Sequence, residues 1–134
     1  MSVMVKGTGG SGSVTQTKLW TNPSPQADYS GTTITLSHSM TDFDYIRVTA
    51  RRWKTDGSVD YETIMPVSLV VTCTGTNQGR FPLAYYGEGT MYARTFEYMS
   101  NTSIKFSNAS KVGASGNLAG ALVPAEVYGM KLPQ

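Results

Sequence analysis

The chain has few of the residues on which metal binding and covalent chemistry usually depend. Its 134 residues include one cysteine, Cys73, and one histidine, His38. A single cysteine cannot form an intrachain disulfide, and the two residues together cannot supply the Cys and His ligands of a typical zinc site. We therefore expect no metal and no disulfide framework, so the fold has to rest on its hydrophobic core.

Charged residues are also scarce. They make up 15% of the chain, and 11 Lys and Arg against 9 Asp and Glu leave a net charge of +2. These basic residues are scattered, whereas nucleic-acid binders cluster them along one surface. No apolar run approaches the length of a membrane-spanning helix, and the N-terminus lacks the apolar segment of a signal peptide. We expect no nucleic-acid partner, no membrane insertion and no export.

Candidates for catalysis are weak. His38 follows an expected strand and stands between serines, without a nucleophile elbow or a Ser-x-x-Lys pattern. The Gly-x-Gly-x-x-Gly spacing at residues 7–12 neither follows an expected strand nor precedes a helical pattern, as dinucleotide binding requires. The sequence also nominates no pair of carboxylates of the kind that glycosidases place across a cleft. We expect that the protein is not an enzyme and binds no cofactor.

Short β-rich runs separated by Gly, Pro, Asn, Asp and Ser clusters dominate the sequence, and this alternation is typical of strands and turns. Helical spacing is missing from every window, so helix should be limited to a turn or two. We expect a flexible Gly/Ser-rich arm over residues 1–15 and one all-β domain over residues 16–134, an antiparallel β-sandwich or jelly roll of about eight strands. The expected strands are Thr17–Thr21, Thr32–Ser37, Tyr45–Trp53, Tyr61–Thr72, Phe81–Tyr86, Met91–Met99, Ser103–Phe106 and Glu126–Leu132.

The clearest strand is Tyr45–Trp53, in which two sets of residues alternate. One set should face the core and the other should face solvent. The core set is Ile46, Val48 and Ala50, and the exposed set is Tyr45, Arg47, Thr49 and Arg51. An Asp-Gly turn within residues 54–58 should lead into the next strand. Pro66 lies inside that strand and cannot donate a ladder hydrogen bond, so we expect an edge position or a break there.

Aromatic and basic side chains on these strands form the candidate binding surface. Tyr, Trp and Arg are enriched at the centres of protein interfaces, and flat rings also stack on sugars. The candidate residues are Arg47, Arg51, Trp53, Tyr85, Tyr86 and Tyr92. The alternating residues Tyr92, Arg94, Phe96 and Tyr98 are interpreted as a sheet face half covered by a neighbouring subunit. Both a subunit interface and a glycan site stay open, and the interface is favoured.

Three segments at the opening of the expected domain and one at its end together resemble one family. Residues Leu19–Pro25, the strands at Thr32–Leu36 and Tyr45–Val48, and the closing segment Val123–Lys131 are similar to the β-sandwich domain of tail, fibre and baseplate structural proteins of phages and prophages of Gram-positive bacteria. The resemblance implies a virion-associated β-sandwich. It supplies no functional residues to carry over, and no coiled-coil or collagen-like shaft accompanies it here.

Two functions follow as expectations. The first is a virion structural protein of the tail, fibre, baseplate or head decoration, which acts by assembly as a homo-oligomer, with a trimer favoured. The alternative is a receptor-binding or carbohydrate-binding module for host attachment, which would recognise a cell-surface glycan. The expected localisation is the virion, after synthesis in the host cytoplasm.

Overall fold

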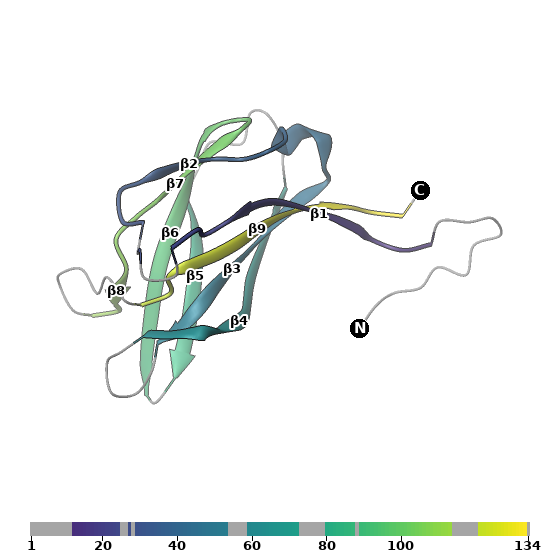
Figure 1. Ribbon diagram of the computed structural model, residues 1–134. Helices are drawn as coiled ribbons and strands as arrows, with labels where there is room; N and C mark the ends of the chain where they lie inside the picture. Colours follow the sequence, from purple (N-terminus) through teal and green to yellow (C-terminus); the bar gives the residue numbers. More distant parts are fainter. Residues whose placement is uncertain are drawn as a thin grey trace.

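Nine strands form two antiparallel sheets in the computed structural model, which describes residues 12–24, 27, 29–53, 59–72, 80–87, 89–113 and 121–133, with the backbone alone for 52, 53, 59–72 and 87. The strands are β1 Thr15–Thr21, β2 Thr33–Thr35, β3 Tyr45–Trp53, β4 Val59–Thr72, β5 Arg80–Gly87, β6 Thr90–Ser100, β7 Ser103–Phe106, β8 Ser110–Lys111 and β9 Pro124–Lys131. The four-stranded sheet has the order β1-β9-β3-β4, and the five-stranded sheet has the order β2-β7-β6-β5, with β8 paired to β6 (Figure 1). The predicted all-β sandwich is confirmed.

All eight expected strands are present, and those at Tyr45–Trp53 and Ser103–Phe106 have the expected bounds. The sequence missed β8, because a two-residue strand is too short to show alternation. A single 3-10 turn at Met40–Asp42, capped by the Ser39 hydroxyl, is the only helical segment among the described residues. The predicted Asp-Gly turn, Cys73 and residues 1–11 of the expected arm lie outside the described residues.

The core lies between the two sheets. The inward-facing set predicted for β3 is confirmed, since Ile46, Val48 and Ala50 are all buried. Phe106 of the five-stranded sheet contacts Trp20 of the four-stranded sheet, with ring centroids 6.0 Å apart. The other buried apolar side chains of this core are Leu19, Ile34, Leu36, Met40, Leu83, Phe96, Ile104, Leu122 and Val127. These side chains join the two sheets into one hydrophobic core.

Pro66 meets both parts of its prediction. Its strand, β4, is at the edge of the four-stranded sheet. The pairing between β3 and β4 jumps from Thr49↔Ser68 to Ala50↔Met65, so Pro66 falls within an irregularity of the ladder. An edge position with a bulge removes the need for the N–H group that proline lacks.

Two residues of the exposed set on β3 are buried instead. Thr49 is 4% exposed and Arg51 is 9% exposed. Thr49 is short, lies between two longer arginines on the same strand face and pairs with Glu126 on β9, so its neighbours cover it. At Arg51 the backbone N–H donates to the Val123 carbonyl at 2.7 Å, which brings the buried segment before β9 against this end of the strand.

The face of β6 that carries Arg94 is internal, so its interpretation as a subunit interface is wrong. Arg94 and Phe96 are each 1% exposed. The guanidinium of Arg94 donates to the carbonyls of Ser107 at 2.7 Å and Ala121 at 2.9 Å, and to the Ser30 hydroxyl at 3.3 Å. Because these acceptors receive N–H groups of Nη1 and Nη2, an arginine can occupy a position whose strand neighbours are core aromatics, although its buried Nε has no hydrogen-bond partner among the described residues.

Candidate functional site

The six candidate residues lie on both sheets and do not form one surface. Arg47, Arg51 and Trp53 belong to β3, whereas the three tyrosines belong to the strands β5 and β6. The side chain of Trp53 is outside the described residues. The binding surface expected from the sequence therefore divides into separate regions.

The three tyrosines point in two directions. Tyr85 and Tyr92 are direct cross-strand partners. Both are half-buried and pack against the core, because Tyr85 has the same phase as the buried Leu83. Tyr86 has the opposite phase and is 64% exposed. Of these three rings, Tyr86 is the one that is fully available to a partner.

Tyr86 lies in an apolar region on the outer side of the five-stranded sheet. Its direct partner across the ladder is Met91, and the next outward pair is Ala84 and Ala93. The N–H of Val112, which follows β8, donates to the Met91 carbonyl at 2.8 Å, so Val112 extends the region beside β6. We name this region the β5–β6 face, and its residues are Pro82, Ala84, Tyr86, Met91, Ala93 and Val112.

Exposed apolar side chains concentrate at this sheet. Six large hydrophobic side chains are exposed among the described residues, and four of them lie on the five-stranded sheet or directly after it, namely Tyr86, Met91, Met99 and Val112. The sequence analysis found only Tyr86. Alternation within the strand at Met91–Met99 was the signal for Met91 and Met99, because the phase opposite to the buried Phe96 faces outward. No such signal was available for Val112.

A polar hollow lies further along the same sheet. It is lined by Gly31, Arg80, Thr95, Glu97, Lys105, Phe106 and Ser107 and has a volume of about 80 Å³. Pockets for small molecules usually measure about 300–1,000 Å³, so this hollow is small for a saccharide. Arg80 Nε lies 3.5 Å from Glu97 Oε2, and both side chains are substantially exposed, so these two charges already pair with each other at the surface.

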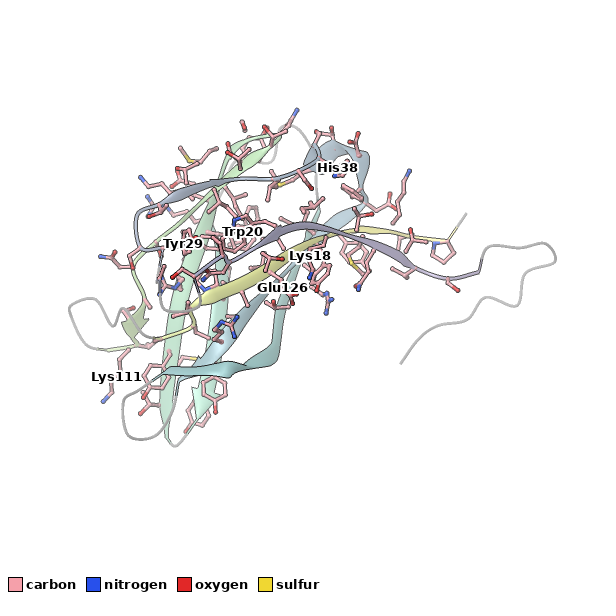
Figure 2. All side chains as sticks on the ribbon, viewed as in Figure 1. Lys18, Trp20, Tyr29, His38, Lys111 and Glu126 are labelled. Atoms are coloured by element: carbon pink, nitrogen blue, oxygen red, sulfur yellow. The ribbon has the colours of Figure 1, made fainter. Side chains whose placement is uncertain are left out.

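Arg47 belongs to a cluster on the outer side of the four-stranded sheet. Its Cζ lies 4.7 Å from the ring centroid of Tyr128, and Nζ of Lys18 lies 5.8 Å from the same ring. Lys18 Nζ also lies 3.0 Å from Glu126 Oε2, and Arg47 Nη2 donates to Gln16 Oε1 at 3.1 Å. We call these five residues the Tyr128 cluster; Figure 2 shows Lys18 and Glu126 side by side.

The ionisable groups of the cluster perturb one another. Burial opposes the charged form of Glu126, but hydrogen bonds from Tyr128 and Lys18 outweigh it and hold the pKa of Glu126 below its usual range. Burial and the hydrogen bond to Glu126 raise the pKa of Tyr128. The hydrogen bond and the charge of Glu126 raise the pKa of Lys18. Each group therefore keeps its usual protonation state at neutral pH. The pKa shifts make none of these groups more reactive, and the cluster serves to join the strands.

The sequence analysis missed four members of this cluster, Gln16, Lys18, Glu126 and Tyr128. They belong to strands at opposite ends of the chain, which pair through Lys18↔Tyr128 and Thr21↔Glu126. On its other side Tyr128 pairs with Arg47. No local pattern signals such contacts, because they depend on which strands become neighbours.

His38 is exposed, as expected. Its Nδ1 lies 3.0 Å from the hydroxyl of Ser37, and its ring meets the edge of Phe43. Among the described residues no carboxylate bonds the other ring nitrogen, which a catalytic triad would require. The labelled ring in Figure 2 lies at the periphery, near the 3-10 turn.

The described part of the chain contains no group of three or more His, Cys, Asp or Glu that is placed to hold a metal ion. Within the same residues, no helix has the length and apolar character needed to span a membrane. No protein-family model matches the chain, and no curated protein matches it significantly.

Proposed function

We propose that this protein is a structural module that acts by assembly, as a virion component of the tail, fibre, baseplate or head-decoration type. The observation that carries this proposal is the β5–β6 face. Soluble monomers rarely expose large contiguous apolar areas, and such areas usually mark contacts with other molecules. Tyr86 and Met91 are of the residue types enriched at protein interfaces.

The shape of this face favours a protein partner. Ala84 and Ala93 at its centre have short side chains, so another flat surface can approach the sheet closely. Tyr86, Met91 and Val112 project around one end and supply apolar contact area. We assign the face to a second copy of the chain, because symmetric homo-oligomers are the usual form of assembling proteins. The trimer favoured from the sequence stays a prediction.

Light scattering of the purified protein tests the proposal. The expected result is an oligomer that falls to a smaller species when Tyr86→Ser and Met91→Ser are combined. Met99→Ser is the matched control, because Met99 is exposed to a similar degree at the other end of β6. Circular dichroism should report an unchanged fold in all variants, since these side chains lie outside the core.

A protein that stays monomeric at the highest attainable concentration contradicts assembly of this kind. A pull-down on Gram-positive cell walls addresses the alternative of a receptor-binding or carbohydrate-binding module. Retention by the walls that survives the Tyr86→Ser, Met91→Ser change would favour that alternative and direct attention to the other surfaces.

A further inference from the structure

The first strand leaves one side of its backbone open to a partner. β1 is at the edge of the four-stranded sheet and pairs with β9. Towards its end the other side is covered, because the Ser37 N–H donates to the Leu19 carbonyl at 2.9 Å. No described residue covers residues 15–17 in this way, and the side chains of Thr15 to Lys18 are all exposed. Open strand edges of this kind are templates for pairing with another chain.

The same end of the sheet carries two exposed apolar side chains. Val14 is 42% exposed and Leu132 is 50% exposed, and the pairing Thr15↔Lys131 places them opposite each other in the next register position. The Leu132 N–H donates to Asp44 Oδ2 at 2.7 Å, which fixes this residue against the start of β3. Figure 1 shows the start of β1 and the end of β9 extending together beyond the other strands.

The other sheet edges are less suited to pairing. β4 contains Pro66 within a ladder irregularity, β5 contains Pro82, and β2 is only three residues long. Proline, bulges and short length are the features by which proteins protect their edges. The N-terminal half of β1 has none of these. Lys18 is the one charged residue of β1 that could discourage pairing with another strand, and its side chain already forms an ion pair with Glu126.

We infer that β1 pairs antiparallel with β1 of a second copy around a two-fold axis at Gln16, which joins two four-stranded sheets into one of eight strands. This register leaves out Leu19, whose backbone is already covered. It sets Thr15 opposite Thr17 of the partner subunit and Val14 against the aliphatic stem of Lys18 of the partner subunit. Threonine pairs and apolar contacts across strands stabilise such ladders. The inference rests on the proposed function and adds a contact separate from the β5–β6 face.

Paired charge changes test this register. Thr15→Lys with Thr17→Lys places like charges directly opposite at both symmetric positions, so the solution mass should fall twofold. Thr15→Lys with Thr17→Glu places opposite charges there and should keep the parental mass. This second variant is the matched control, because it alters the same two exposed positions. A third variant, Thr15→Glu with Thr17→Glu, should not pair with a second copy of itself, because like charges again lie opposite each other. When it is mixed with the double-lysine variant, it should restore the parental mass.

Light scattering separates failure of this inference from failure of the proposed function. Equal masses for the parent and both homocharged variants overturn β1 pairing, and an oligomer that still depends on Tyr86 and Met91 then leaves the proposed function in place. A mass that halves with the double-lysine change but ignores the Tyr86→Ser, Met91→Ser change supports β1 pairing and removes the β5–β6 face as the basis of assembly. A monomeric parent overturns both.

Discussion

At Gly129 the lack of a side chain is required by packing. A Cβ built at this position would lie 2.5 Å from Cγ and Cδ2 of the Phe43 ring, which is closer than carbon atoms can approach. Gly129 is in β9 between Thr17 and Ile46 of the two neighbouring strands, so the backbone cannot easily move away. The ring of Phe43 therefore fills the space that any larger residue would need.

We predict that Gly129→Ala lowers the free energy of unfolding by about 1–3 kcal/mol, the usual cost of overpacking. Urea denaturation measures the change. In a Phe43→Ala background the same substitution should cost less than about 0.5 kcal/mol, because the clashing ring is gone. A neutral or stabilising Gly129→Ala change in the parental protein would contradict the close packing of Phe43 on this strand.

Burial was predictable for some residues and not for others. The alternation of Ile46, Val48 and Ala50 identified the core face of β3 correctly, because apolar side chains at every second position of a strand lie on one face, and that face is favourably buried. Arg94 and Thr49 were misassigned because their burial depends on acceptors and neighbours from distant segments. The Ser107 and Ala121 carbonyls that receive the Arg94 guanidinium lie in other parts of the chain. A local pattern contains no information about them.

At the scale of elements, the Tyr128 cluster fastens the edge strand β1 to β9 and β3. The folded protein lowers the pKa of Glu126, so this carboxylate binds its proton more weakly than in the unfolded chain. A lowered pKa contributes stability above the unfolded value, about 4.3, and that stability is lost as the pH falls through the folded value. Lys18 and Tyr128 have raised pKa values, so their share is present below about pH 10 and is lost as the pH rises further.

We predict that the parental protein loses more stability than Glu126→Gln when the pH is lowered from 6 to 3. Thermal unfolding of both proteins across this range measures the difference, with the other carboxylates common to both. On the alkaline side, Lys18→Met should reduce the loss above about pH 10. Parallel curves for parent and Glu126→Gln in acid would mean that the carboxylate does not hold β1 in solution.

The existence of the strands was predictable from the sequence, but the pairing of each strand with its neighbours was not. Turn residues and β-rich runs placed eight strands within a few residues of their observed bounds. The candidate site was predicted less well, because its composition depends on pairing. Tyr86 was identified from residue type alone, whereas Met91 and Val112 become its neighbours only through the β5–β6 and β6–β8 pairs.

For the whole molecule, Trp20 reports on the contact between the sheets. It belongs to β1 of the four-stranded sheet and lies against Phe106 of the five-stranded sheet, and it also meets Tyr29 edge to face at 5.2 Å (Figure 2). Its fluorescence should therefore change when the two sheets separate, while far-ultraviolet circular dichroism follows the strands themselves.

We predict coincident unfolding transitions by these two signals in a Trp53→Phe variant, which leaves Trp20 as the only tryptophan. One shared core makes the sandwich a single cooperative unit, and small domains of this kind usually unfold in one step. An earlier fluorescence transition would mean that the sheets part before the strands unfold. Unfolding of the same variant at several protein concentrations should separate the effect of assembly from that of the core.

The order of strands in the four-stranded sheet also sets the order in which the protein can fold during synthesis. β9 lies between β1 and β3, although it is the last strand of the chain. A ribosome adds about 5–20 residues per second, so β1 and one edge of β3 remain without β9 for several seconds after they have been synthesised. During that interval both strands have backbone N–H and C=O groups without a strand partner. Mutations that slow the arrival of β9 should therefore reduce the yield of soluble protein even where they leave the finished fold unchanged.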